Sequence, residues 1–162
     1  MKRAVVFAHY DKDCLIDDYV VYYIKALKEA GCDVVFVSCK ELTQVELNKL
    51  NGLIINAITE KHDEYDFGSY KRGFLYLKPF LSNYDELIFA NDSCYGPLYP
   101  ISEVFEKMEK EDCDFWGLLK IISDIKRNSG IYLQDVRIFK VILFFLRKMF
   151  LLQKFLKTLC HQ

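Results

Sequence analysis

Short, uninterrupted apolar runs alternate along the chain with longer segments in which apolar residues recur at helical spacing. Apolar runs that are bounded by polar or turn-forming residues are typical of buried strands. The runs that we predict as strands cover residues 4–8, 34–38, 53–55, 87–90 and 114–118. The segments that we predict as helices cover residues 17–28, 43–50, 68–81 and 102–110.

The helix ends and the order of these segments predict the fold class. Asp17 or Asp18 can cap the first helix, and Gly31 can end it. Thr43 and Glu46 have the spacing of a capping box at the second helix. Strands that are apolar throughout and alternate with helices are typical of a parallel sheet covered on both faces. We therefore expect an α/β fold with a Rossmann-like, mostly parallel sheet and helices on both faces.

Polar side chains follow the strand predicted over residues 87–90. This strand ends in Asn91, Asp92 and Ser93. In an open α/β sheet the ligand crevice lies at the carboxyl ends of the strands, so we interpret these residues as the centre of a ligand site. The alternative is that Asp92 and Ser93 only cap turns, as such residues often do.

Other polar residues are expected at the same edge of the sheet. His9 and Asp11 follow the first predicted strand, and Asp66 precedes the third predicted helix. His9 can contact a base or phosphate, or it can be a structural histidine. The loop after the first strand contains no glycine, which argues against a dinucleotide-type phosphate cradle.

Composition and charge limit the class of protein. The 162 residues are 52% apolar, and six cysteines include no CxxC pair, so we expect a reduced, cytoplasmic, globular protein. No secretory signal peptide precedes the first predicted strand. Residues 1–119 carry a net charge of −8 and residues 120–162 carry +7. We therefore divide the chain into an α/β domain over residues 1–119 and a basic, apolar, helical tail over residues 120–162.

Three blocks of sequence resemble the rhamnan synthesis protein F family of bacterial polysaccharide glycosyltransferases. They cover residues 8–24, 65–73 and 84–98, the last being closed by residues 112–118. The resemblance implies a rhamnosyltransferase-like enzyme of cell-surface polysaccharide or lipopolysaccharide biosynthesis, with a nucleotide sugar as donor. It also implies that an acidic motif at a strand end holds Mg²⁺ or Mn²⁺ with the sugar diphosphate. Asp92, between Asn91 and Ser93, stands where this metal-binding motif is expected.

The resemblance extends the proposed donor site to the third predicted helix. Gly68 would let the diphosphate approach the backbone at the helix start, and Lys71 and Arg72 would supply positive charge. Asp66 would bind a ribose or sugar hydroxyl, or it would cap the helix. His62 is expected to face solvent. The sequence identifies no catalytic residue.

The resemblance is expected to end near residue 118, which leaves two interpretations of the tail. Residues 136–160 can form a basic, apolar helix that docks a non-catalytic module on a membrane surface or a protein partner. Alternatively, the sequence after residue 118 is out of frame or truncated, and the enzyme is inactive because it is incomplete. The expected acceptor is a polysaccharide or lipid-linked glycan at the inner face of the cell membrane. Nucleic acid is not an expected partner, because the predicted domain is acidic.

Overall fold

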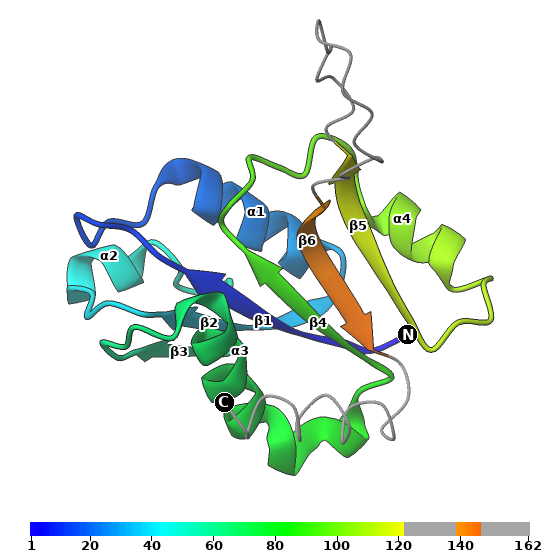
Figure 1. Cartoon of the computed structure of the whole chain (residues 1–162), viewed down its shortest axis with the longest axis horizontal. Coiled ribbons are helices and arrows are strands. Elements are labelled where there is room, and N and C mark those ends of the chain that lie inside the picture. The colour runs from blue at the N-terminus through cyan, green and yellow to red at the C-terminus, as the bar shows by residue number, and fades with distance from the viewer. Residues whose placement is uncertain (122–138, 147–162) are drawn as a thin grey trace, which may run out of the picture.

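A computed structural model describes residues 1–121 and 139–146, which form a six-stranded sheet with helices beside it (Figure 1). In chain order the helices and strands are β1 (Arg3–His9), α1 (Asp18–Glu29), β2 (Cys32–Ser38), α2 (Gln44–Asn48), β3 (Asn56–Thr59), α3 (Tyr65–Leu77), the 3-10 helix η1 (Lys78–Asn83), β4 (Glu86–Asn91), α4 (Ile101–Met108), β5 (Phe115–Ile121) and β6 (Phe139–Leu146).

The sheet has the strand order β3-β2-β1-β4-β6-β5. Strands β3, β2, β1 and β4 are parallel, whereas β6 runs antiparallel to both of its neighbours. Ala8 pairs with Asn91, so β1 and β4 end side by side, as their arrowheads show in Figure 1. The mostly parallel sheet predicted from the sequence is confirmed, and its central strands bring the residues that follow them to one edge.

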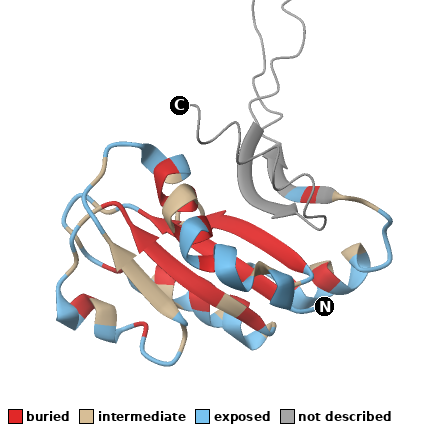
Figure 2. Ribbon diagram, turned by 90° about the horizontal axis from the view of Figure 1, so that it is seen from below, coloured by how far each residue is buried: buried red, intermediate tan, exposed pale blue. Residues whose placement is uncertain are grey.

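Helices pack on both faces of the sheet. Val5 and Phe7 of β1 face a core cluster that includes residues of α1 and α4, whereas Val6 and Ala8 face a second cluster with α3. Successive side chains of a strand point to opposite faces, so a strand covered on both faces is apolar at every position. The buried central strands in Figure 2 show this arrangement.

Helix α3 lies unusually close to the sheet. A Cβ atom added to Gly73 would lie 2.3 Å from Cγ1 of Val6 and 3.1 Å from Cγ2 of Val37. Only glycine allows this approach, and it fixes the position of α3 on β1 and β2. The first turn of α3 is thereby held near the carboxyl ends of these strands.

Two predicted boundaries are wrong. Strand β3 begins at Asn56, and the apolar residues Leu53 and Ile54, which we assigned to this strand, pack against the first core cluster instead. Helix α3 begins at Tyr65 rather than residue 68. Both errors arise because a short apolar run indicates that a segment is buried but does not show which backbone conformation the segment adopts.

Part of the predicted helical tail is a strand. Residues Phe139–Leu146 form β6, which is hydrogen-bonded between β4 and β5, so the helix predicted there is wrong. A short run of β-branched and aromatic residues fits an internal strand as well as a helix, and only its pairing decides. Residues 120 and 121 belong to β5, and the rest of the tail lies outside the described residues. The domain boundary near residue 119 stays a prediction. No helix within residues 1–121 is long and apolar enough to cross a membrane.

Candidate functional site

The ends of β1 and β4 bring His9 and Asp92 into contact. His9 is 3% exposed, and its Nε2 lies 3.0 Å from the carbonyl oxygen of Leu15. Its Nδ1 lies 2.7 Å from Oδ2 of Asp92. The imidazole is therefore fixed at one nitrogen and directed beside a carboxylate at the other.

The carboxylate of Asp92 is oriented by the backbone of the β1–α1 loop. Its Oδ2 accepts a hydrogen bond of 2.9 Å from the backbone N–H of Tyr10, and its side chain is 10% exposed. The hydroxyl of Tyr19 donates to the Asp92 carbonyl oxygen at 3.3 Å. Burial and the nearby Asp92 carboxylate raise the pKa of Tyr19 to about 12, so this phenol keeps its proton at neutral pH.

A second acidic residue joins the site from α3. The side-chain amide of Asn91 donates a hydrogen bond of 2.7 Å to Oδ2 of Asp66. Burial raises the pKa of Tyr70 and of Cys39, and the carboxylates of Asp66 and Asp92 contribute to both shifts. Both carboxylates therefore lie near the same two side chains. The structure brings His9, Asp66, Asn91 and Asp92 together at one edge of the sheet.

Two of the predicted site residues mainly shape the backbone. Oδ1 of Asp11 accepts hydrogen bonds from the backbone N–H groups of Asp13, at 2.8 Å, and Leu15, at 3.1 Å. Asp11 thus holds the β1–α1 loop in a turn. Ser93 is exposed, and its backbone N–H donates to Oδ1 of Asn91 at 3.4 Å. Asp11 therefore has a turn-forming role, and this contact of Ser93 fits the turn-capping alternative.

Glu46 of α2 fixes the same loop and was not predicted as a site residue. Its Oε2 accepts hydrogen bonds from the backbone N–H of Ile16, at 2.6 Å, and from Nζ of Lys49, at 2.7 Å. Thr43 caps α2 as predicted, but Glu46 turns away from the capping box to the loop. In the sequence Glu46 stands three residues before Lys49, and this pattern does not indicate a contact with the distant residue Ile16.

Gly68 does not open a path for a ligand at the start of α3. A Cβ atom added there would lie 2.4 Å from Cβ of Glu64 and 3.0 Å from Cε1 of His62. The glycine instead lets the preceding loop pack on the helix, so its predicted role is corrected. Asp66 lies in the first turn while Glu64 is the N-cap residue, so the capping alternative for Asp66 is wrong.

The positive charge predicted beside Gly68 is reduced. Nη1 of Arg72 lies 2.5 Å from Oε2 of Glu64, and its Nε lies 3.4 Å from Oε2 of Glu60. The hydrogen bond from Arg72 lowers the pKa of Glu64, so this pair is ionised at neutral pH. Arg72 is thus neutralised by two acids, whereas half-buried Lys71 forms no ion pair within the described residues.

His62 does not simply face solvent, as we had predicted. Its Nδ1 accepts a hydrogen bond of 3.3 Å from the backbone N–H of Glu64, and its Nε2 lies 3.1 Å from Oγ of Ser69. Burial and the nearby Arg72 lower the pKa of His62. His62 is therefore a neutral residue that links the loop to α3.

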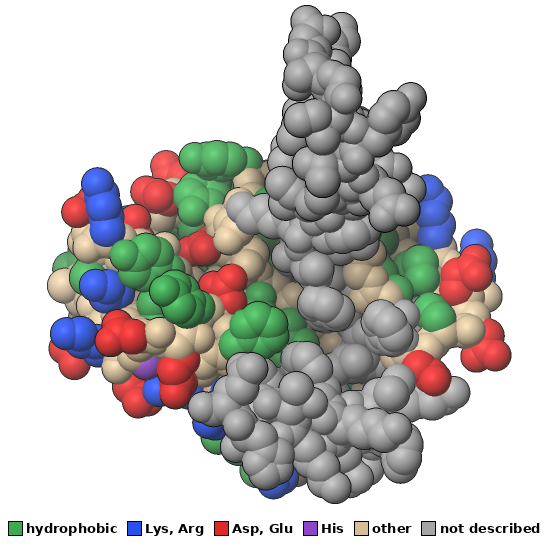
Figure 3. Space-filling view, viewed as in Figure 1, with side chains coloured by type: hydrophobic (Ala, Val, Ile, Leu, Met, Phe, Trp, Pro, Cys, Tyr) green, Lys and Arg blue, Asp and Glu red, His purple; other side chains and the backbone are tan. Residues whose placement is uncertain are grey.

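Side chains of several kinds lie around this edge of the sheet. Acidic, basic and apolar side chains are interspersed over the left half of the view in Figure 3. Within residues 1–121 and 139–146, no group of three or more His, Cys, Asp or Glu side chains could hold a metal ion. A metal at this edge would therefore need ligands from a bound molecule.

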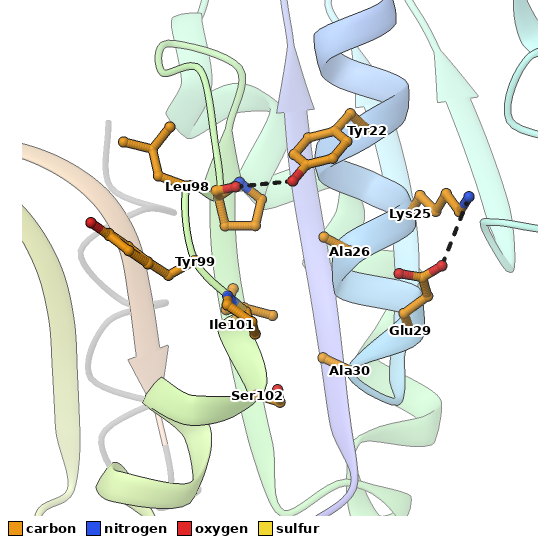
Figure 4. Close-up of a pocket in the computed structure, with 11 residues that line it drawn as sticks. Tyr22, Lys25, Ala26, Glu29, Ala30, Leu98, Tyr99, Ile101 and Ser102 are labelled. Carbon is orange, nitrogen blue, oxygen red and sulfur yellow. Dashed lines mark hydrogen bonds and ion pairs between the residues drawn. The ribbon is translucent and has the colours of Figure 1, made fainter.

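A groove of about 380 Å³ lies beside the segment that follows Asp92 (Figure 4). Tyr22 of α1 points across it and donates a hydrogen bond of 3.3 Å to the carbonyl oxygen of Pro97. The lining residues are Tyr22, Lys25, Ala26, Glu29, Ala30, Pro97, Leu98, Tyr99, Pro100, Ile101 and Ser102. The sequence did not predict this groove, because its two walls come from distant parts of the chain.

A known protein family matches this chain. The model of the family described as rhamnan synthesis protein F matches residues 34–154. The match passes residue 118, so the expectation that the resemblance ends there is wrong. The out-of-frame or truncated interpretation of the tail stays a prediction. The block over residues 8–24 lies outside the matched segment. A search of curated protein sequences found no match.

Solved structures extend the comparison to the fold. A CMP:2-keto-3-deoxy-manno-octonic acid synthetase complexed with CTP aligns over 97% of this chain and 78% of its own, with a TM-score of 0.58 and 13% identity. At this identity the likeness concerns the fold alone. A protein from Desulfovibrio desulfuricans G20, provisionally named a nucleotide-diphospho-sugar transferase, aligns over 66% of this chain and 53% of its own. Its TM-score of 0.36, at 15% identity, supports no argument.

Proposed function

Because the chain belongs to the rhamnan synthesis protein F family, we propose that it binds a nucleotide-sugar donor where β1, β4 and α3 meet. The proposed activity is that of a rhamnosyltransferase-like glycosyltransferase in cell-surface polysaccharide biosynthesis, working at the cytoplasmic face of the membrane. The acceptor would be a polysaccharide or a lipid-linked glycan. The hydrogen bond between Asn91 and Asp66 is the observation that carries the proposal, because it places both proposed donor-binding elements at one site.

The fold supports a nucleotide as the ligand. The similar synthetase structure is a complex with CTP, and open α/β sheets bind ligands at the carboxyl ends of their strands. Here that edge holds the carboxylates of Asp66 and Asp92, which can accept hydrogen bonds from ribose or sugar hydroxyls. Lys71 of α3 would supply positive charge for a diphosphate, as the sequence resemblance implies. Arg72 is not included among the proposed diphosphate-binding residues, because Glu60 and Glu64 already neutralise its charge.

The carboxylate ligands at this edge also suit a divalent metal ion that the protein and the diphosphate would bind together. Mg²⁺ in nucleotide sites is commonly bound by one or two carboxylates and by substrate phosphates. Asp92 would provide the protein carboxylate, and its contacts with Nδ1 of His9 and with the backbone N–H of Tyr10 both use Oδ2. When bound, such a metal supplies charge neutralisation for the departing diphosphate.

The alternative of a membrane-docking module has less support. Its proposed docking segment, residues 136–160, includes β6, which is hydrogen-bonded to a neighbour on each side. A strand inside the sheet cannot also be a docking helix on its surface. We therefore retain donor binding as the function.

Calorimetric titration with nucleoside diphosphates and nucleoside diphosphate sugars, including rhamnose donors, tests the proposal. We expect saturable binding by the full chain, weakened at least tenfold by Asp92→Ala. The matched control is Asp112→Ala, which removes an exposed acid at the opposite edge of the sheet and should leave the affinity unchanged. Circular dichroism checks that both variants fold. The proposal is overturned if the wild-type chain binds no nucleotide, or if both variants weaken binding equally.

A further inference from the structure

The groove beside α1 begins one helical turn from the proposed donor site. The hydroxyl of Tyr19 donates a hydrogen bond to the carbonyl oxygen of Asp92, and the hydroxyl of Tyr22 donates to that of Pro97. Residues three apart lie on neighbouring turns of one helix face, about 4.5 Å apart along its axis. The two tyrosines therefore hold the segment that leaves β4 along α1, and Tyr22 stands at the groove (Figure 4). A molecule in the groove would lie close to a donor bound at Asp92.

The lining of the groove combines apolar surface with polar groups. Ala26 and Ala30 lie about one turn apart on α1 and point toward residues 97–102, and their small side chains leave space in front of the helix (Figure 4). At the rim, Nζ of Lys25 lies 3.9 Å from Oε1 of Glu29, so the two charges compensate. The volume of about 380 Å³ falls at the lower end of the range of about 300–1,000 Å³ that is usual for small-molecule sites. The groove thus suits a small, uncharged molecule.

A pyranose ring of a glycan matches this lining. The C–H groups of such a ring form an apolar face that packs on an aromatic ring or on methyl groups, while its hydroxyls donate and accept hydrogen bonds at the edge. Tyr22, which is 58% exposed, offers the aromatic ring, and Ser102 offers a hydroxyl. Leu98 and Tyr99 of the same segment are 85% and 79% exposed, and large apolar side chains grouped on a surface mark a binding site. A phosphate-bearing ligand fits less well, because the lysine of the rim is paired with a glutamate.

We propose that the groove between α1 and residues 97–102 binds one or two pyranose rings of an uncharged acceptor glycan. This inference rests on the proposed function, because a transferase must hold its acceptor beside its donor. Tyr22 would stack on the face of one sugar ring, and Ser102 would hydrogen-bond a sugar hydroxyl. The groove would thereby direct the end of the glycan toward the edge where β1 and β4 end.

Saturation-transfer difference NMR of the full chain with maltotriose and with a rhamnose trisaccharide tests this site. We expect saturable binding of at least one of these uncharged glycans. Ala26→Leu keeps a strong helix former but fills the groove, so it should weaken this binding at least tenfold. Lys28→Leu is the matched control, because it adds the same side chain to an exposed position of α1 outside the groove and should leave the affinity unchanged.

A second variant covers the case in which Ala26→Leu disturbs the fold. Tyr22→Ala removes an exposed ring and should also weaken glycan binding at least tenfold, and circular dichroism checks that each variant folds. The inference is overturned if the wild type binds neither glycan, if Lys28→Leu weakens binding as much as Ala26→Leu, or if both groove variants bind normally. Aromatic grooves also bind proline-rich peptides, so a proline decapeptide that binds here in place of both glycans would overturn it too.

The calorimetric titration with nucleoside diphosphates separates this inference from the proposed function. Nucleotide binding without glycan binding would remove the acceptor site and leave the donor site standing. Glycan binding without nucleotide binding would do the reverse and leave a glycan-binding groove on a chain that binds no donor.

Discussion

Asn91, the last residue of β4, donates a hydrogen bond of 2.7 Å to Asp66 in the first turn of α3. The two residues are 25 positions apart, and the packing of α3 on β1 and β2 brings them to the same edge of the sheet. The bond crosses from the sheet to the helix at the edge where β1 also ends. The proposed donor site depends on this link, because it places Asp66 and Asp92 at the same edge.

A double-mutant cycle with Asn91→Ala and Asp66→Ala measures the strength of this link. A half-buried hydrogen bond to a carboxylate should give a coupling free energy of about 1 kcal/mol. Urea unfolding of the wild type, both single variants and the double variant provides the measurement. Additive effects of the two changes would show that the bond does not hold α3 to β4.

Gly73→Ala should destabilise the fold although alanine is the better helix former. The helix preference favours alanine by about 1 kcal/mol. The added Cβ would meet the stiff side chain of Val6 at 2.3 Å, and such overpacking costs about 1–3 kcal/mol. We expect a net loss of up to about 2 kcal/mol in unfolding free energy, by the difference of these two terms.

The Val6→Ala background is the control for this substitution. Removing the valine methyl groups takes away the nearest contact, so Gly73→Ala should there be neutral or stabilising in the same urea experiment. Equal destabilisation in both backgrounds would mean that Val6 is not the cause.

Glu46→Gln should destabilise the chain in a pH-dependent way. The backbone N–H of Ile16, with Lys49, holds the pKa of Glu46 below its ordinary value near 4.5. A carboxylate with a lowered pKa stabilises the fold fully above its unfolded pKa, and this stabilisation is lost as the pH falls through the folded value. The difference in urea midpoint between wild type and variant should be largest near pH 6 and shrink below pH 4.5. A difference that is constant with pH would exclude this ion pair as its source.

Cys32 should resist alkylation while Cys94 reacts. Burial raises the pKa of Cys32 to about 12, and its side chain is only 1% exposed. About one Cys32 thiol in ten thousand is then ionised at pH 8, and thiolates are the reactive form. Cys94 is half-buried in the segment after β4. Peptide mapping after iodoacetamide treatment should show Cys94 modified first, and both should react in urea. Faster reaction at Cys32 would contradict its burial.

The hydrophobic pattern was sufficient for the central parallel strands β1, β2 and β4, but it misplaced the start of β3 and failed for β6. Runs such as residues 34–37 and 87–90 are apolar at every position, which is typical of a strand buried on both faces. The run over residues 139–146 is apolar except at Lys140, but its pairing with β4 and β5 decides that it is a strand. Pairing between distant segments leaves no periodic signal in either segment.

The sequence by itself determined that Asn91 and Asp92 follow a buried strand, because local polarity marks the carboxyl end of a strand. It also determined the order of strands and helices, from which a crevice at that edge follows. Only the tertiary structure decided how the polar groups there are used. It neutralises Arg72 with two acids, fills the space at Gly68 with Glu64, and directs Nδ1 of His9 beside Asp92. These outcomes depend on distances between residues that are far apart in the chain, and a linear pattern of residue types carries no information about such distances.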